Sequence, residues 1–181
     1  QFHTTVWNEW SLYPTFNINY APAPGNVWQL SLSSDKSYPD YWATQDAVSY
    51  MGGGYSEIHG NPYLKPEINY QLQLTYVLNS KYMFNAWYSH TKDNATQTLY
   101  QSPERLVEIY KYFNFDFEQQ AGVQAVVPFA IGRWLKSRFT LTGVYDRQKD
   151  SDFWDIPFDR KAYYAMLNMN HTVTLFSHPD I

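Results

Sequence analysis

Cysteine is absent from this chain of 181 residues. Disulfides, thiolate metal sites and a cysteine nucleophile are therefore excluded. Charged residues make up only 17% of the chain and the formal net charge is −4, so the basic surface typical of nucleic-acid-binding proteins is missing. No apolar run approaches the roughly 18 residues that a membrane-spanning helix requires.

Aromatic residues are abundant by contrast, at 19% of the chain, with 17 Tyr, 11 Phe and 7 Trp. Tyr and Trp favour membrane–water interfaces, where an apolar ring and a polar tip are both satisfied. A soluble, aromatic-rich β domain that binds sugars would have a similar composition. Composition alone therefore leaves a membrane protein and a soluble β protein both open.

Apolar residues recur at every second position in several segments. The clearest run is formed by Ile68, Tyr70, Leu72, Leu74, Tyr76 and Leu78. Similar alternation occurs in 12–20 and 28–32. Alternate side chains of a strand point to opposite faces, so each segment is predicted to be a strand with one apolar and one polar face. Segments of about 9–11 residues can cross a bilayer as tilted strands.

The pattern predicts seven strands, at 10–20, 27–36, 66–78, 82 to about 100, 107–127, 134–147 and 161–176. Their connections alternate between short turns, at 21–26, 79–81 and 128–133, and longer ones. The longer connections are a loop at 37–65, a tall hairpin tip near 102–105 and a polar loop at 148–160. Outer-membrane barrels have this alternation, whereas a β-sandwich has no reason for it. We therefore predict an all-β fold, an antiparallel up-and-down meander of about seven strands that forms a partial outer-membrane β-barrel.

A proline-rich motif joins the long loop to the strand at 66–78. Its defining residues are Gly60, Asn61, Pro62, Leu64, Lys65, Pro66 and Glu67. The prolines fix φ and hold the residues before them extended, which makes a rigid entry from loop into strand. The motif resembles the G-N-P-x-L-K-P-E segment of TonB-dependent outer-membrane receptors and their Bacteroides-type relatives. Residues 13–20 and 113–124 resemble, more weakly, two other strands of that family.

The resemblance implies that the long loops are extracellular and the short turns periplasmic. It also implies energised uptake of an unknown bulky nutrient, with the outer-membrane bilayer and a TonB-type complex as partners. We expect residues 1–181 to be a single segment of a barrel domain, with the N-terminal plug and the remaining strands outside it. No enzyme activity, cofactor, metal site or nucleic-acid partner is expected.

Aromatic residues in the loops are the candidate ligand contacts, because rings beside amides and carboxylates suit stacking on sugars or similar ligands. They are Tyr41, Trp42, Tyr50, Tyr55 and Trp154. Packing between loops and an interfacial aromatic girdle would account for the same residues. Two other functions stay open: a soluble carbohydrate-binding domain, which requires a compact two-sheet core, and a surface enzyme, which requires convergent acid–base residues.

Overall fold

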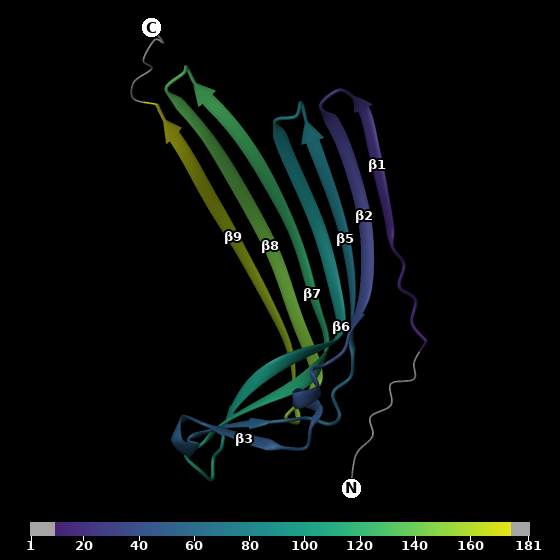
Figure 1. The fold of residues 1–181 in the computed structure, drawn as a ribbon, viewed down its shortest axis with the longest axis vertical. Helices are drawn as coiled ribbons and strands as arrows, with labels where there is room; N and C mark the ends of the chain where they lie inside the picture. Colours follow the sequence, from purple (N-terminus) through teal and green to yellow (C-terminus); the bar gives the residue numbers. More distant parts are fainter. Residues whose placement is uncertain (1–9, 175–181) are drawn as a thin grey trace.

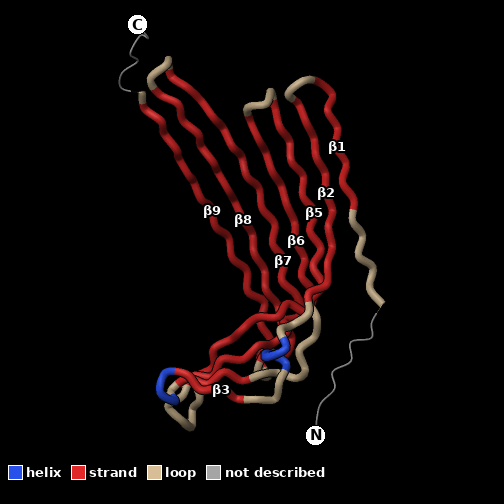
Figure 2. Tube along the Cα trace, viewed as in Figure 1, coloured by secondary structure: helices blue, strands red, loops and turns tan. Residues whose placement is uncertain are grey.

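The computed structural model describes residues 10–174, which form a curved antiparallel meander (Figures 1 and 2). Its long strands are β1 (Phe16–Ala23), β2 (Asn26–Ser37), β5 (Glu67–Leu78), β6 (Tyr82–Gln101), β7 (Glu108–Ile131), β8 (Leu135–Phe153) and β9 (Ile156–Val173). They pair in the order β1-β2-β5-β6-β7-β8-β9, and no pairing joins β1 to β9 within the described residues. The predicted seven-strand meander, a barrel wall that is not closed, is confirmed.

The predicted strand limits need three corrections. The first strand begins at Phe16 instead of residue 10, and the predicted turn at 128–133 is shorter because Pro128 still pairs with Arg138 in the sheet. The polar loop predicted at 148–160 is wrong: both strands continue to a tight turn at Trp154 and Asp155, whose φ values of 52° and 62° suit a hairpin. Polar residues replace apolar ones there without ending the backbone pairing. The predicted end of the last strand at Phe176 lies outside the described residues.

The long connection between β2 and β5 has structure of its own. It contains the short helix η1 (Tyr41–Thr44), strand β3 (Val48–Met51), the short helix η2 (Gly52–Gly54) and strand β4 (Ser56–His59). β3 and β4 form a hairpin, and β4 pairs in parallel with the start of β7. This parallel pair departs from the purely antiparallel sheet that the sequence predicts.

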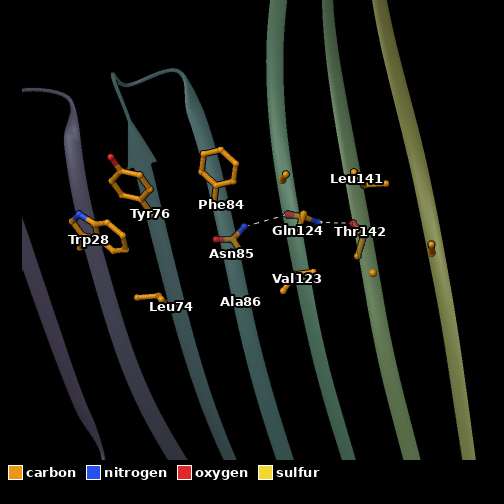
Figure 3. A pocket seen from close by; sticks show the side chains of 13 residues that line it. Trp28, Leu74, Tyr76, Phe84, Asn85, Ala86, Val123, Gln124, Leu141 and Thr142 are labelled. Carbon is orange, nitrogen blue, oxygen red and sulfur yellow. Dashed lines mark hydrogen bonds between the residues drawn. The ribbon is translucent and has the colours of Figure 1, made fainter.

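The long strands have two distinct faces, as the alternation predicts. On one face, the ring of Tyr76 stacks at 4.0 Å from Trp28 and lies 6.3 Å from Phe84, measured between centroids. On the other face, Thr75 donates a hydrogen bond of 2.9 Å to Asn85. Asn85 is bonded in turn to Gln124, and Gln124 to Thr142, at 3.2 Å each (Figure 3). The sheet therefore separates an apolar surface from a polar, internally hydrogen-bonded one.

The apolar face is exposed and has the height of a bilayer core. Its side chains on β9 run from Tyr163, through Leu167 and Met169, to Val173, and are between 50% and 77% exposed. Ten residue steps of about 3.4 Å give about 34 Å along the strand, or about 26 Å at a tilt of about 40°. This matches the apolar band of about 25 Å that outer-membrane barrels expose to lipid.

The described residues contain a single layer of sheet, and it has no second sheet packed over its apolar face. Buried apolar side chains are few there: Ala43, Leu64, Ile68, Phe115 and Val144. The two-sheet core required by a soluble carbohydrate-binding domain is thus not formed in 10–174. None of the helices in this part of the chain is both long enough and apolar enough to cross a membrane.

Candidate functional site

The longest hairpin, formed by β6 and β7, extends beyond the apolar band and bends away from the wall. Its bent part lies beside β3 and β4, at the bottom of Figure 1. We call its distal part, residues 92–117, the β6–β7 arm. Asp93 has a φ of 53° within β6, a conformation that is uncommon outside glycine. The arm is the scaffold on which the other long-loop elements are placed.

The odd-numbered residues of the arm's second strand contact the tip of the β8–β9 hairpin. Phe115 packs edge to face on Phe153 and Phe158, at 5.6 and 5.0 Å between ring centroids. Phe113 contacts Trp154 at 5.1 Å, and Trp154 also stacks on Tyr100 at 4.6 Å. Such aromatic pairs contribute about 0.5–1.5 kcal/mol each beyond their buried area. The cluster therefore holds two neighbouring hairpins together.

The even-numbered residues of the same strand hold the long loop. Asn114 accepts a hydrogen bond from the Lys65 amide at 2.7 Å and donates to the Lys65 carbonyl at 3.0 Å and to the Asp93 carbonyl at 2.6 Å. Two residues earlier, the Tyr112 carbonyl accepts a hydrogen bond of 2.9 Å from Nδ2 of Asn61. One strand thus separates the aromatic cluster from the long loop, each on its own face.

The other motif residues complete this attachment. Gly60 lies so close to Gln45 that an added Cβ would stand 1.8 Å from its backbone oxygen, so only glycine fits. Leu64 is 1% exposed, and a carboxylate oxygen of Glu67 accepts a hydrogen bond from the Ala95 amide at 3.1 Å. The motif 60–67, with Pro62 and Pro66 inside it, is therefore a structural clamp, although the side chains of Tyr63 and Lys65 are exposed.

An ion pair that the sequence did not reveal fixes the β3–β4 hairpin. Arg105, at the tip of the arm, donates to both carboxylate oxygens of Glu57, at 2.9 and 3.3 Å. His59 Nε2 lies 2.8 Å from the same carboxylate. The hydrogen bond with His59 and then the one with Arg105 lower the pKa of Glu57 below its ordinary value. The carboxylate is fully engaged, which suits a structural tie between elements 48 residues apart.

The five candidate ligand contacts fall into two groups. Tyr41, Tyr50 and Tyr55 are 80%, 70% and 64% exposed, and they lie on η1, on β3 and after η2. Trp42 packs edge to face on Tyr112 at 5.7 Å, while Trp154 belongs to the aromatic cluster. Both tryptophans thus contact another ring while remaining 48% and 41% exposed, and the three tyrosines are more exposed still.

Within 10–174, no group of three or more His, Asp or Glu side chains is arranged to hold a metal ion. The long-loop surface presents rings, amides and hydroxyls, which are groups suited to binding.

An open, two-faced antiparallel wall with structured loops at one end defines a segment of a membrane-spanning β-barrel. Residues 3–179 match the outer membrane protein beta-barrel family. The chain belongs to this family and lies in the bacterial outer membrane. A search of curated proteins gives no match.

Solved structures of similar fold extend this result. The siderophore receptor PirA from Pseudomonas aeruginosa aligns with a TM-score of 0.57 and 10% identity, over 91% of this chain and 36% of that one. A mutant of the ferric enterobactin receptor PfeA from Pseudomonas aeruginosa, in complex with enterobactin, aligns with a TM-score of 0.50 and 12% identity, over 91% and 33%. The chain spans about a third of the length of these receptors, and the likeness is one of fold.

Proposed function

We propose that this chain forms part of the wall and the extracellular loops of a TonB-dependent receptor that takes up a bulky nutrient. The alignment of nearly the whole chain with one third of a siderophore receptor is the observation that carries the proposal. In this role the polar face lines the lumen around a plug domain, and a TonB-type complex supplies energy through that plug. The role is one of transport, without catalysis.

The exposed tyrosines are the residues we propose for first contact with the nutrient. Tyr50 and Tyr55 lie on the hairpin that the Glu57–Arg105 pair holds against the arm, and Tyr41 lies on η1. Rings on a fixed support bind with a smaller loss of conformational entropy than rings on a free loop. Trp42 and Trp154 contribute indirectly, because they hold the loop and the neighbouring hairpin tip in place.

Uptake by cells that carry the complete receptor tests this proposal. Accumulation of labelled ferric siderophores and other bulky nutrients is compared between the parent strain and a strain without the gene, with and without an uncoupler of the proton gradient. We expect one nutrient to accumulate only in the parent strain and only while the gradient is maintained. Accumulation that survives the uncoupler would identify a passive pore and refute TonB dependence.

Variants then test the tyrosine contacts. The double change Tyr50→Ala and Tyr55→Ala is expected to raise the nutrient concentration for half-maximal uptake, with little effect on the amount of receptor in the membrane. Tyr20→Ala is the matched control, because Tyr20 is similarly exposed, at 62%, but lies near the short turns. Equal effects of the double variant and of the Tyr20 control would show that Tyr50 and Tyr55 are not part of the binding surface.

A further inference from the structure

The apolar face of the sheet contains a hollow where small residues meet. Ala86, Val123, Gly143 and Ala165 lie side by side in register across β6, β7, β8 and β9. They are shared by two adjoining hollows of about 500 and 690 Å³, of which Figure 3 shows the first. The flanking rings are bulky: Trp28, Tyr76 and Phe84 on one side, and Tyr145 and Tyr163 toward the long-loop end.

A cluster of cations lies just beyond the tyrosines on the same face. Tyr145 pairs with Tyr163, and the next outward-facing pairs along β8 and β9 are Arg147 with Lys161 and Lys149 with Asp159. Alternate residues of a strand share a face, so these side chains stand directly above the tyrosine pair. The ring centroids of Tyr145 and Tyr163 are 4.9 Å apart.

The charges of this cluster do not balance. Arg147 donates to both carboxylate oxygens of Asp159, at 2.8 Å each. Lys149 and Lys161 also lie near that carboxylate, so three cations face one anion and leave a net charge of +2. Lys161 is exposed and Lys149 half-buried, and the surplus charge lies at the border between the apolar band and water.

We propose that this surface binds a membrane lipid with a phosphate-bearing headgroup, from the leaflet on the long-loop side. Lys149 and Lys161 bind the phosphate, and an acyl chain occupies the hollow over Gly143 and Ala165. The four residue steps from Lys161 to Ala165 span about 13 Å of strand, so one lipid molecule reaches both places. Charge complementarity selects an anionic lipid, since a cation near a membrane surface attracts such headgroups.

This inference rests on the outer-membrane location of the family and not on the proposed uptake. Loss of nutrient transport would leave it standing, and loss of lipid binding would leave the transport proposal standing.

Lipid affinity of the complete receptor tests the proposal. Native mass spectrometry of the protein in detergent measures binding of dipalmitoyl phosphatidylglycerol and of dipalmitoyl phosphatidylcholine, which has the same chains and no net charge. The double change Lys149→Gln and Lys161→Gln is expected to weaken phosphatidylglycerol binding roughly 25-fold, about five-fold for each lysine. Binding of phosphatidylcholine should fall much less, because its choline cation offsets the phosphate charge. Lys136→Gln is the matched control, because Lys136 lies on the polar face near a short turn.

The hollow is tested by filling it. A Cβ at Gly143 would meet only the Val123 side chain, at 3.9 Å, so Gly143→Leu enters open space without backbone strain. The Gly143→Leu change is expected to weaken binding of both lipids several-fold, and Ala165→Leu on the next strand should have the same effect. Equal wild-type affinity for the two lipids, no effect of the lysine changes, or no effect of either leucine would overturn the proposal. Full competition by inorganic phosphate would overturn it as well, because the acyl chain would then contribute nothing.

Discussion

Removal of the Asn114 side chain is expected to release the long loop from the wall while the sheet stays folded. Asn114→Ala deletes three hydrogen bonds, two to the Lys65 backbone and one to the Asp93 carbonyl. At a net value of about 1 kcal/mol each, and with two of the three exposed to solvent, the loss is about 2–3 kcal/mol. This cost falls on local opening of the loop, because Asn114 is not needed for the backbone pairing of β6 with β7.

Hydrogen exchange of the complete barrel protein in detergent measures that opening. A loss of about 2–3 kcal/mol speeds exchange of the Lys65 amide about 30- to 140-fold, since each 1.4 kcal/mol is a factor of ten. Asn114→Asp should not rescue it, because a carboxylate oxygen would then face the two carbonyl oxygens. Asn168→Ala, at an exposed position in β9, is the matched control. Unchanged amide exchange rates of residues 61–67 in the Asn114→Ala variant would refute the conclusion that Asn114 holds the loop to the arm.

Three further outcomes are expected. The lowered pKa of Glu57 means that its ion pair stabilises the fold fully above the ordinary value of 4.5 and fails as pH falls through the lower folded value. A spin label on β3 should therefore stay immobile from neutral pH to about 4.5, and mobility gained between pH 7 and 5 would contradict this. Gly122→Val places a side chain where the Trp87 ring now lies 2.1 Å from the added Cβ, so urea unfolding should detect a loss of about 1–3 kcal/mol, and a neutral result would argue against that contact. Spin labels at Leu72 and Gln73 should be accessible to oxygen and to a polar reagent respectively, whereas exclusion of both probes at Leu72 would indicate a buried core.

The membrane-spanning part of the fold is predictable from the sequence because a single requirement, alternation of lipid-facing and water-facing side chains, governs the residues there. Lipid on one side and water on the other impose strict alternation, and the pairs from Leu72 with Leu32 to Tyr76 with Trp28 preserve it across strands. Beyond the bilayer both faces meet water or protein, so the alternation fades. That is why the outer parts of β8 and β9 were predicted as a loop, although backbone pairing continues to the turn at Trp154.

The candidate site was predicted less completely, because its contacts join residues far apart in the chain. The motif at 60–67 predicted a rigid entry into β5, and the structure places the motif directly before that strand, with the Lys65 amide hydrogen-bonded to Asn114. The partner of Lys65 is 49 residues away, and Glu57 is 48 residues from Arg105. No local pattern indicates either pair, since each depends on the register of β7 with its neighbours. The sequence indicated Trp154 as an aromatic loop residue, but not its contacts with Tyr100 and Phe113, which lie more than 40 residues away in the chain.

The alternating residues of β7 make different contacts at different heights of the wall. Within the membrane its odd residues face lipid and its even residues face the lumen; beyond it, the odd residues hold the β8–β9 tip and the even ones hold the long loop. The β3–β4 hairpin is fixed to the same strand by four residue pairs and by the Glu57–Arg105 ion pair. Tyr50 and Tyr55 are therefore attached to β7 through the hairpin that carries them. The tyrosines are thus joined to the β6–β7 arm, and Asp93, with a φ of 53°, lies in β6 at the base of that arm.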